Sequence, residues 1–172
     1  ADERQAEAVV NAREYEALTA AMDAYLAYCD AVKDAALEAD KRVKKAVAAA
    51  AASQADQMLE DATCGGMCEG NGVFYQEGGN ELLTEILNGL RKRHFSAAMF
   101  VVVGNEDTLL LGAYCGEAAR AAGLKAGELM RKLAPLAGGK GGGKDDMARG
   151  SGKPDTDVDE LLGKAIEAMN QH

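Results

Sequence analysis

The chain has 172 residues and a formal net charge of −9, from 28 acidic and 19 basic residues. This length fits one ordinary domain with an appendage, and the negative charge argues against nonspecific binding of nucleic acid or membrane by the whole surface. No apolar run approaches the roughly 20 residues that cross a bilayer, and no signal segment opens the chain. We therefore expect a cytoplasmic protein with no membrane partner.

The cysteines do not indicate a disulfide scaffold or a metal site. There are four, at Cys29, Cys64, Cys68 and Cys115, which is too few and too scattered for a scaffold. Cys64 and Cys68 could supply two zinc ligands, but no second close pair completes a four-ligand site. We expect reduced thiols, no metal and no cofactor.

Residues 1–63 are predicted to form a helical region. Residues 2–63 contain no Gly and no Pro and are rich in strong helix formers. Apolar residues recur at alternating spacings of three and four, which is the a/d pattern of a coiled coil. The members predicted to join two copies are Tyr15, Leu18, Met22, Tyr25, Cys29, Val32 and Val43. The row continues through the smaller residues Ala36, Ala39, Ala46 and Ala50.

Such a helix cannot bury its apolar stripe alone. It must fold back as a hairpin, pair with another chain or lie on the following domain. One continuous helix would be roughly 90 Å long, and we expect a break within residues 29–41. Pairing with a second copy is the expected fate of the remaining stripe, and the spacing leaves a parallel and an antiparallel pair open.

Residues 64–172 are predicted to form a small globular domain. A loop to Gly72 precedes a short strand at residues 73–76, and a helix over 81–93 has Asn80 as its N-cap. Apolar runs at 97–103 and 108–114 predict a hairpin of two buried strands. An amphipathic helix spans 124–136, and a final helix over 158–169 is capped by residues 155–157. This order predicts an α+β fold, with helices packed on a small mixed sheet.

Between the last two predicted helices lies a segment rich in glycine and lysine, here called the glycine–lysine loop (residues 138–152). Residues 138–153 hold seven Gly and four Lys or Arg. Glycine lets another backbone come close, and successive amides in such turns can form an anion site. The surrounding residues 120–153 carry eight basic and three acidic residues, and such clustered charge is typical of nucleic-acid contact.

The sequence allows two other interpretations of this loop. Gly138, Gly143 and Lys144 fit the spacing G-x-x-x-x-G-K of a nucleotide-binding P-loop. That motif needs Ser or Thr next, a strand before it and a helix after it, whereas Asp145 comes next and a helix is predicted before it. The loop could also be a flexible, solvated linker.

In this order the residues resemble one known family. Lys125-Ala126-Gly127-Glu128-Leu129, the glycine–lysine loop and its Asp146-Met147-Ala148 resemble the C-terminal domain of alanyl-tRNA synthetase. That domain is similar to the DHH-associated domain of certain phosphoesterases. The resemblance implies a non-catalytic module that contacts the outer corner, or elbow, of tRNA. In the family it helps link aminoacylation and editing, and its helical part joins two copies of the synthetase.

Carried onto this chain, the resemblance implies tRNA contacts at Lys125, Gly139, Lys140, Gly141, Gly142, Gly143, Lys144, Arg149 and Lys153. The expected partners are tRNA, a second copy and the remainder of the synthetase chain. Asp145 and Asp146 depart from the pattern, because carboxylates there could pair with Lys144 or Lys153 and weaken the site.

Two alternatives remain beside the tRNA-binding module. The first is a structural dimerisation domain whose glycine loop is only a turn. The second is the C-terminal half of a DHH-type phosphoesterase, which would need a partner domain with metal ligands. The Asp- and His-rich metal motifs of that class are absent from this sequence, so we expect no catalysis by this chain alone.

Overall fold

The computed structural model describes residues 2–64 and 70–171. Two compact units divide the chain, residues 1–46 and residues 47–172. The functional division at residues 63 and 64 stays a prediction. Most of the predicted loop after Cys64, and the Cys68 thiol with it, lies outside the described residues.

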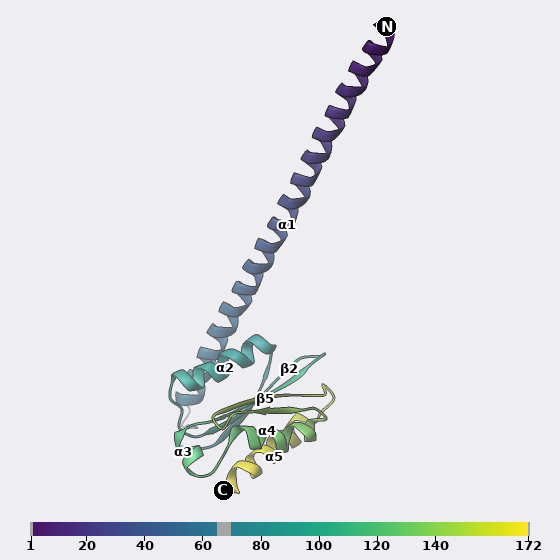
Figure 1. Ribbon diagram of the computed structural model, residues 1–172. Coiled ribbons are helices and arrows are strands. Elements are labelled where there is room, and N and C mark those ends of the chain that lie inside the picture. Colours follow the sequence, from purple (N-terminus) through teal and green to yellow (C-terminus); the bar gives the residue numbers. More distant parts are fainter. Residues whose placement is uncertain (1, 65–69, 172) are drawn as a thin grey trace. The chain divides into compact units, whose positions relative to one another are not determined.

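The N-terminal region is one helix, α1 (Asp2–Cys64) (Figure 1). The predicted helix is therefore confirmed, and the predicted break within residues 29–41 is wrong. With no Gly or Pro between residues 2 and 63, nothing in the sequence removes a backbone hydrogen bond or favours a non-helical backbone. Burying the apolar stripe within a hairpin would require a turn, and residues 29–41 are good helix formers that do not favour one.

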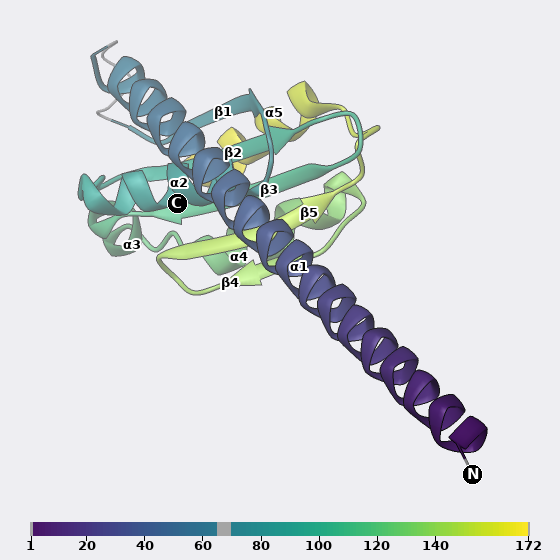
Figure 2. The ribbon, with the colours of Figure 1, turned by 90° about the horizontal axis from the view of Figure 1, so that it is seen from above.

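The second unit is built on a five-stranded sheet of order β1-β2-β3-β5-β4 (Figure 2). Its strands are β1 (Gly72–Glu77), β2 (Ala98–Gly104), β3 (Leu109–Cys115), β4 (Gly141–Gly143) and β5 (Met147–Gly152). β1 runs parallel to β2, and the other neighbours are antiparallel. The predicted α+β fold with a mixed sheet is confirmed, as is the β2–β3 hairpin.

Helices cover both faces of this sheet (Figure 1). α2 (Asn80–Lys92) and the last turns of α1 bury one face, here called the α2 face, whose core includes Leu59, Ile86 and Val101. α4 (Ala126–Leu133) and α5 (Val158–Asn170) bury the opposite α4 face, around Phe100 and Met130. The alternation of strand residues between two cores explains why β2 is apolar throughout.

Three details of the predicted elements are corrected by the structure. The glycine–lysine loop forms strands β4 and β5 rather than an irregular loop. Asn80 is the first residue of α2 and makes no side-chain cap, since Gly79 precedes the helix. The helix predicted over 124–136 is α4 followed by a 3-10 helix, η2 (Ala134–Ala137), which contains Pro135. The short helix α3 (Glu117–Ala121) was not predicted.

The start of α5 agrees with its predicted cap. Asp157 is the N-cap, and its Oδ1 accepts a hydrogen bond of 3.1 Å from the backbone N–H of Glu160. This bond satisfies one of the helix's first amides, which otherwise have no partner within the helix.

We predict that Asp157→Ala lowers the free energy of unfolding by about 1 kcal/mol, the usual effect of losing an N-cap. The measurement is urea unfolding of the whole chain. Asp155→Ala is the matched control, because it removes the same charge from an exposed residue outside the helix. Equal losses in the two variants would show that charge, and not the cap, is responsible.

Candidate nucleic-acid interface

The glycine–lysine loop lies at the edge of the sheet as a β-hairpin (Figure 2). β4 pairs with β5 so that Gly142 lies opposite Arg149. Hydrogen bonds extend the ladder at both ends, from Lys144 N–H to the Met147 carbonyl (2.9 Å) and from Ser151 N–H to the Lys140 carbonyl (3.0 Å). The hairpin is therefore ordered by its own backbone rather than left free as a linker.

Five backbone amides of this segment are held by carbonyls and so cannot contribute to the anion-binding concavity that the sequence suggested. Besides the two ladder bonds, the amides of Gly138 and Gly139 donate to the carbonyls of η2, and Lys153 N–H donates to the Ala137 carbonyl at 2.7 Å. An amide held by a carbonyl is not available to a phosphate. At these five positions an anion would find no free amide.

The first turn of α4 is closed by the hairpin. The N–H groups of Ala126 and Gly127 donate to the carbonyls of Asp145 and Lys144, each at 2.9 Å. A Cβ at Gly127 would lie only 2.6 Å from the Gly143 carbonyl oxygen. Glycine is thus required for this close approach, and the positive end of α4 is occupied by the protein's own carbonyls.

The glycines of β4 have two different environments. A Cβ at Gly141 would lie 2.8 Å from the Gly150 Cα, and a Cβ at Gly143 would lie 2.5 Å from the Ala148 Cα. These two positions have no room for a side chain. Around Gly142, by contrast, a Cβ would meet no atom within 4 Å. Gly142 is therefore the position where packing does not explain the glycine.

The hairpin presents basic side chains on the α2 face of the sheet. Residues paired across a ladder share a face, and residues two apart on a strand share it as well. The pairing therefore places Lys140, Gly142, Lys144 and Arg149 together, and we call this set the basic face. Its three cationic residues are all exposed, because the strand residues buried in the core of the α2 face belong to β2 and β3.

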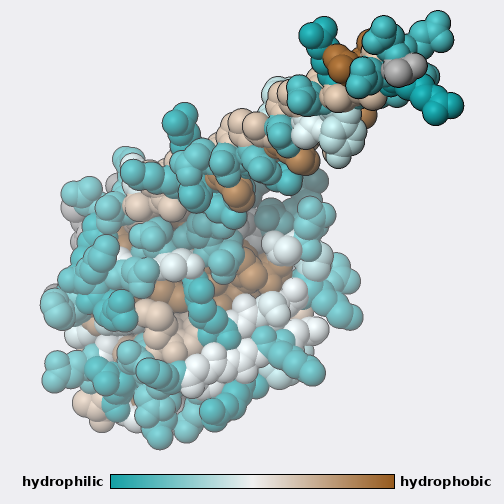
Figure 3. Space-filling model, turned by 45° about the horizontal axis from the view of Figure 1, so that its top comes forward, coloured by the Kyte–Doolittle hydropathy of each residue, from teal (hydrophilic) through white to brown (hydrophobic). Residues whose placement is uncertain are grey.

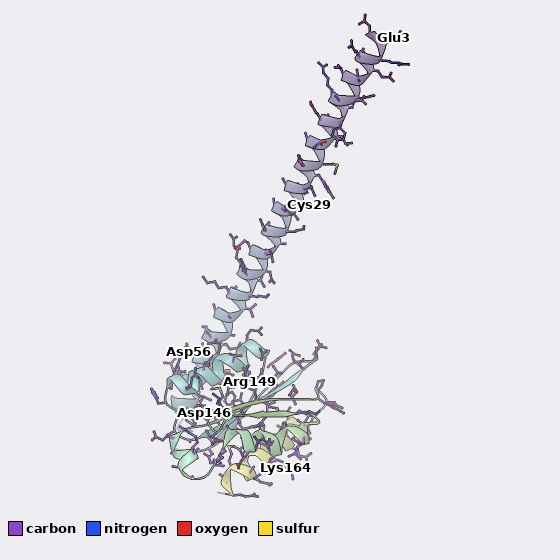
Figure 4. The ribbon with its side chains drawn as sticks, in the orientation of Figure 1. Glu3, Cys29, Asp56, Asp146, Arg149 and Lys164 are labelled. Carbon is purple, nitrogen blue, oxygen red and sulfur yellow. The ribbon has the colours of Figure 1, made fainter. Side chains whose placement is uncertain are left out.

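Arg149 connects the basic face to α2. Its guanidinium donates a hydrogen bond to Thr84 Oγ1, and Figure 4 shows the side chain beside α2. Gly112 of β3 and Gly142 of β4 flank Arg149 in the sheet. Thr84 was not among the predicted site residues, and since the bond joins positions 65 apart, no local pattern could have indicated it.

The other two lysines among the predicted contact residues lie away from the basic face. Lys125 is the N-cap residue of α4, at the turn of the hairpin, and its Nζ is 3.8 Å from a Glu128 carboxylate oxygen. Lys153 follows β5 at the other end, where it lines a hollow of about 310 Å³ with Asp157 and Lys164. Gly139 also lies at that end, packed on the backbone of Ser151.

The two acidic residues of the hairpin turn, Asp145 and Asp146, accept hydrogen bonds through their backbone carbonyls. The Asp145 carbonyl accepts from Ala126, and the Asp146 carbonyl accepts from Cys115 N–H at 2.9 Å. Among the ion pairs found within residues 2–64 and 70–171, none joins Asp145 or Asp146 to a lysine. The suggested pairing with Lys144 or Lys153 is thus not seen in the described chain.

The groups with shifted pKa values do not resemble catalytic groups. Burial raises the pKa of the Cys115 thiol to about 11, so the thiol stays protonated and is a poor nucleophile at neutral pH. Burial also raises the pKa of Tyr114, whose hydroxyl donates to the Phe95 carbonyl at 3.0 Å. Among the described residues, no three His, Cys, Asp or Glu side chains come together as a metal site would require.

The predicted dimerisation residues lie in the first unit, and all seven are on α1. Their larger side chains are exposed, with Tyr15 at 72% and Tyr25 at 68%. Figure 3 shows apolar side chains emerging among hydrophilic ones along this helix. No helix within the described ranges has the length and apolar character that a bilayer span requires.

Comparison with known proteins identifies a matching family and several similar proteins. The DHHA1 domain family matches residues 70–171. An alanine–tRNA ligase of Akkermansia muciniphila is 44% identical over 138 residues, which is 80% of this chain and 14% of that protein. One of a Nocardioides species is 48% identical over 63 residues, or 36% of this chain and 7% of that protein. The chain thus spans a small part of the length of these relatives.

Among solved structures, the C-Ala domain from Aquifex aeolicus alanyl-tRNA synthetase aligns with 59% of this chain and 87% of its own. The identity is 20% and the TM-score 0.48. The family match and the sequence relatives confirm the resemblance stated from the glycine–lysine loop and its surroundings.

We predict that Gly143→Ala lowers the free energy of unfolding by about 1–3 kcal/mol, because the added Cβ overpacks the hairpin. Gly142→Ala is the matched control in the same strand, with an expected change within about 0.5 kcal/mol. Thermal and urea unfolding of both variants measure the difference. A similar loss at both positions would contradict the packing described for β4.

Proposed function

This chain belongs to the DHHA1 domain family, and we propose that it acts as the non-catalytic C-terminal module of an alanine–tRNA ligase. In this proposal the basic face binds the elbow of tRNA, and α1 joins two copies of the synthetase. The module itself needs no cofactor. Its role is to hold tRNA for the aminoacylation and editing parts of the larger protein.

The observation that carries the tRNA proposal is the basic face itself. Lys140, Lys144 and Arg149 are exposed around a glycine that has open space beside it. The protein as a whole is acidic, with a net charge of −9. An RNA would therefore be attracted to this hairpin and repelled by much of the remaining surface.

The residue types of the basic face suit folded RNA better than a sequence-specific site. Folded RNA is recognised largely through its shape, phosphates and 2′-hydroxyls. Lysine contacts a phosphate as a point charge, and Gly142 would let the ribose–phosphate backbone come close to β4. The residues from 138 to 153 include no aromatic side chain that could stack on a base. We infer contacts to the RNA backbone.

The dimerisation part of the proposal rests on the exposed stripe of α1. Tyr15, Leu18 and Met22 are 72%, 61% and 58% exposed. Burying such side chains against another helix is favourable by roughly 25 cal/mol per Å². A continuous helix cannot fold back to cover its own stripe, so a second helix would have to supply the cover.

We predict that the double variant Lys140→Glu, Lys144→Glu loses tRNA binding by the whole 172-residue chain. For the unchanged protein, affinity should fall steeply as salt rises, since binding releases counterions from the phosphates. Removing two phosphate contacts should reduce the slope of log affinity against log salt by about two. Fluorescence anisotropy of labelled tRNA across a salt series gives both quantities.

Arg91→Glu, Lys92→Glu is the matched control, because it makes the same charge change at the end of α2. We expect this control to bind tRNA within a few-fold of the unchanged protein. If no binding is detected at low salt while the chain sediments as a dimer, the tRNA role is wrong and the chain is an assembly domain.

We also predict that Gly142→Val weakens tRNA binding at least tenfold while the chain remains folded. The valine side chain has space in the free protein and is favoured in strands, so only a close partner would meet it. A full-length tRNA and an acceptor-stem hairpin without the elbow are compared. Equal binding of both RNAs would contradict elbow recognition, and unchanged binding by the variant would place the contact elsewhere.

A further inference from the structure

The apolar stripe of α1 differs in size between its two halves. Its N-terminal half, up to Tyr25, carries large side chains, which are Tyr15, Leu18, Met22 and Tyr25. Its C-terminal half, from Val32 to Ala46, carries smaller ones, which are Val32, Ala36, Ala39, Val43 and Ala46. Cys29 lies between the two halves and is half-buried (Figure 4). The stripe is thus bulky at one end and shallow at the other.

The charge on α1 is divided at the same place. Residues 15–30 contain three acidic residues and no basic one, a net of −3. Residues 31–46 contain five basic and three acidic residues, a net of 5 − 3 = +2. Within residues 15–46, ion pairs along the helix surface join Lys33 to Asp30, Lys41 to Glu38 and Lys44 to Asp40. These pairs do not change the difference in net charge between residues 15–30 and residues 31–46.

We propose that α1 pairs antiparallel with α1 of a second copy, over residues 15–46. This inference rests on the dimerisation proposed above and adds its direction and register. Each large residue faces a small one at the same height along the pair. The layers are Tyr15 on Ala46, Leu18 on Val43, Met22 on Ala39, Tyr25 on Ala36 and Cys29 on Val32.

Packing favours this direction over a parallel pair. In antiparallel coiled coils an a position of one helix faces a d position of the other. The two residues of each layer above have numbers that add up to 61, and this register satisfies that rule along the whole stripe. Every layer then holds similar volume, so the two helices keep one spacing. A parallel pair in register would place Tyr15 on Tyr15 and Ala36 on Ala36. Those layers differ in width, which would leave gaps around the alanines that well-packed interfaces avoid.

Electrostatics favour the same direction. The antiparallel pair sets residues 15–30, at −3, beside residues 31–46 of the second copy, at +2. A parallel pair would set −3 beside −3 and +2 beside +2, and like charges placed together disfavour an association. The paired span of 32 residues is about 48 Å long. Size and charge are separate properties of the sequence, and both give the same arrangement.

Disulfide cross-linking tests the direction in the whole chain. Cys29, Cys64 and Cys68 are changed to serine, and the buried Cys115 is kept. Leu18→Cys and Val43→Cys are then made separately in this background. We expect neither variant to cross-link alone and the mixture of the two to give the mixed disulfide on mild oxidation. Homodisulfides in the separate variants would show a parallel pair and overturn the proposal.

A matched control tests the register. Ala36→Cys lies seven residues from Val43 on the same stripe, which is about 10 Å along the helix. Mixed with Leu18→Cys it should not cross-link, and mixed with Tyr25→Cys it should. A dimer that cross-links Leu18→Cys to Ala36→Cys is antiparallel in another register, and the layers above are then wrong.

Sedimentation equilibrium of the background variant separates the two levels of the proposal. A monomer at micromolar concentration would show that dimerisation itself fails, and the direction with it. A dimer with the wrong cross-links would leave dimerisation standing and remove only the antiparallel arrangement. Salt is an independent readout, since raising it should weaken an antiparallel dimer and strengthen a parallel one.

Discussion

The second unit depends on one close backbone contact, where α4 meets the β4–β5 hairpin without an intervening side chain. A Cβ at Gly127 would meet the Gly143 carbonyl oxygen at 2.6 Å, and two helix amides donate to carbonyls of the hairpin turn. The hairpin is therefore fixed to the helix by its backbone. Its side chains remain free to point elsewhere, which is why a glycine-rich segment can be rigid and also present charge.

That contact determines where the charge is displayed. The sheet extends by two strands beyond β3, while the strand residues buried on the α2 face belong to β2 and β3, with Met147 of β5 partly buried beside them. Alternation along β4 and β5 sends one set of residues into the α4 core and the other set to the uncovered face. Ala148 belongs to the first set and is buried, whereas Arg149 belongs to the second and is exposed. A one-residue shift of the hairpin would bury the arginine, so its register and the basic face are specified together.

The sequence predicted the helical character of residues 2–63, the buried strands and the Asp157 cap, because each depends on local chemistry and on the spacing of apolar residues. It did not predict β4 and β5. Glycine has low strand propensity, and residues 147–152 join the sheet by pairing with β3, which is distant along the chain. Without that pairing, the sequence analysis grouped Lys125, Lys140 and Lys153 into one basic segment, because they are close along the chain. The fold sends them to the turn, the open face and the far end of the hairpin.

The absence of a turn in α1 changes how its alanines should be understood. In a folded-back hairpin, the small residues of the stripe would face the large ones of the same chain. The stripe would then be buried within one chain. In one continuous helix the bulky and shallow halves of the stripe cannot meet within a chain. The same complementarity is still present in the sequence, with the charges divided at the same point. Only an antiparallel second copy brings the two halves together, because reversing the direction is what sets residues 15–30 against residues 31–46. In the proposed dimer, the unbroken helix, which contradicted the prediction of a break, would turn an internal fit into a fit between copies.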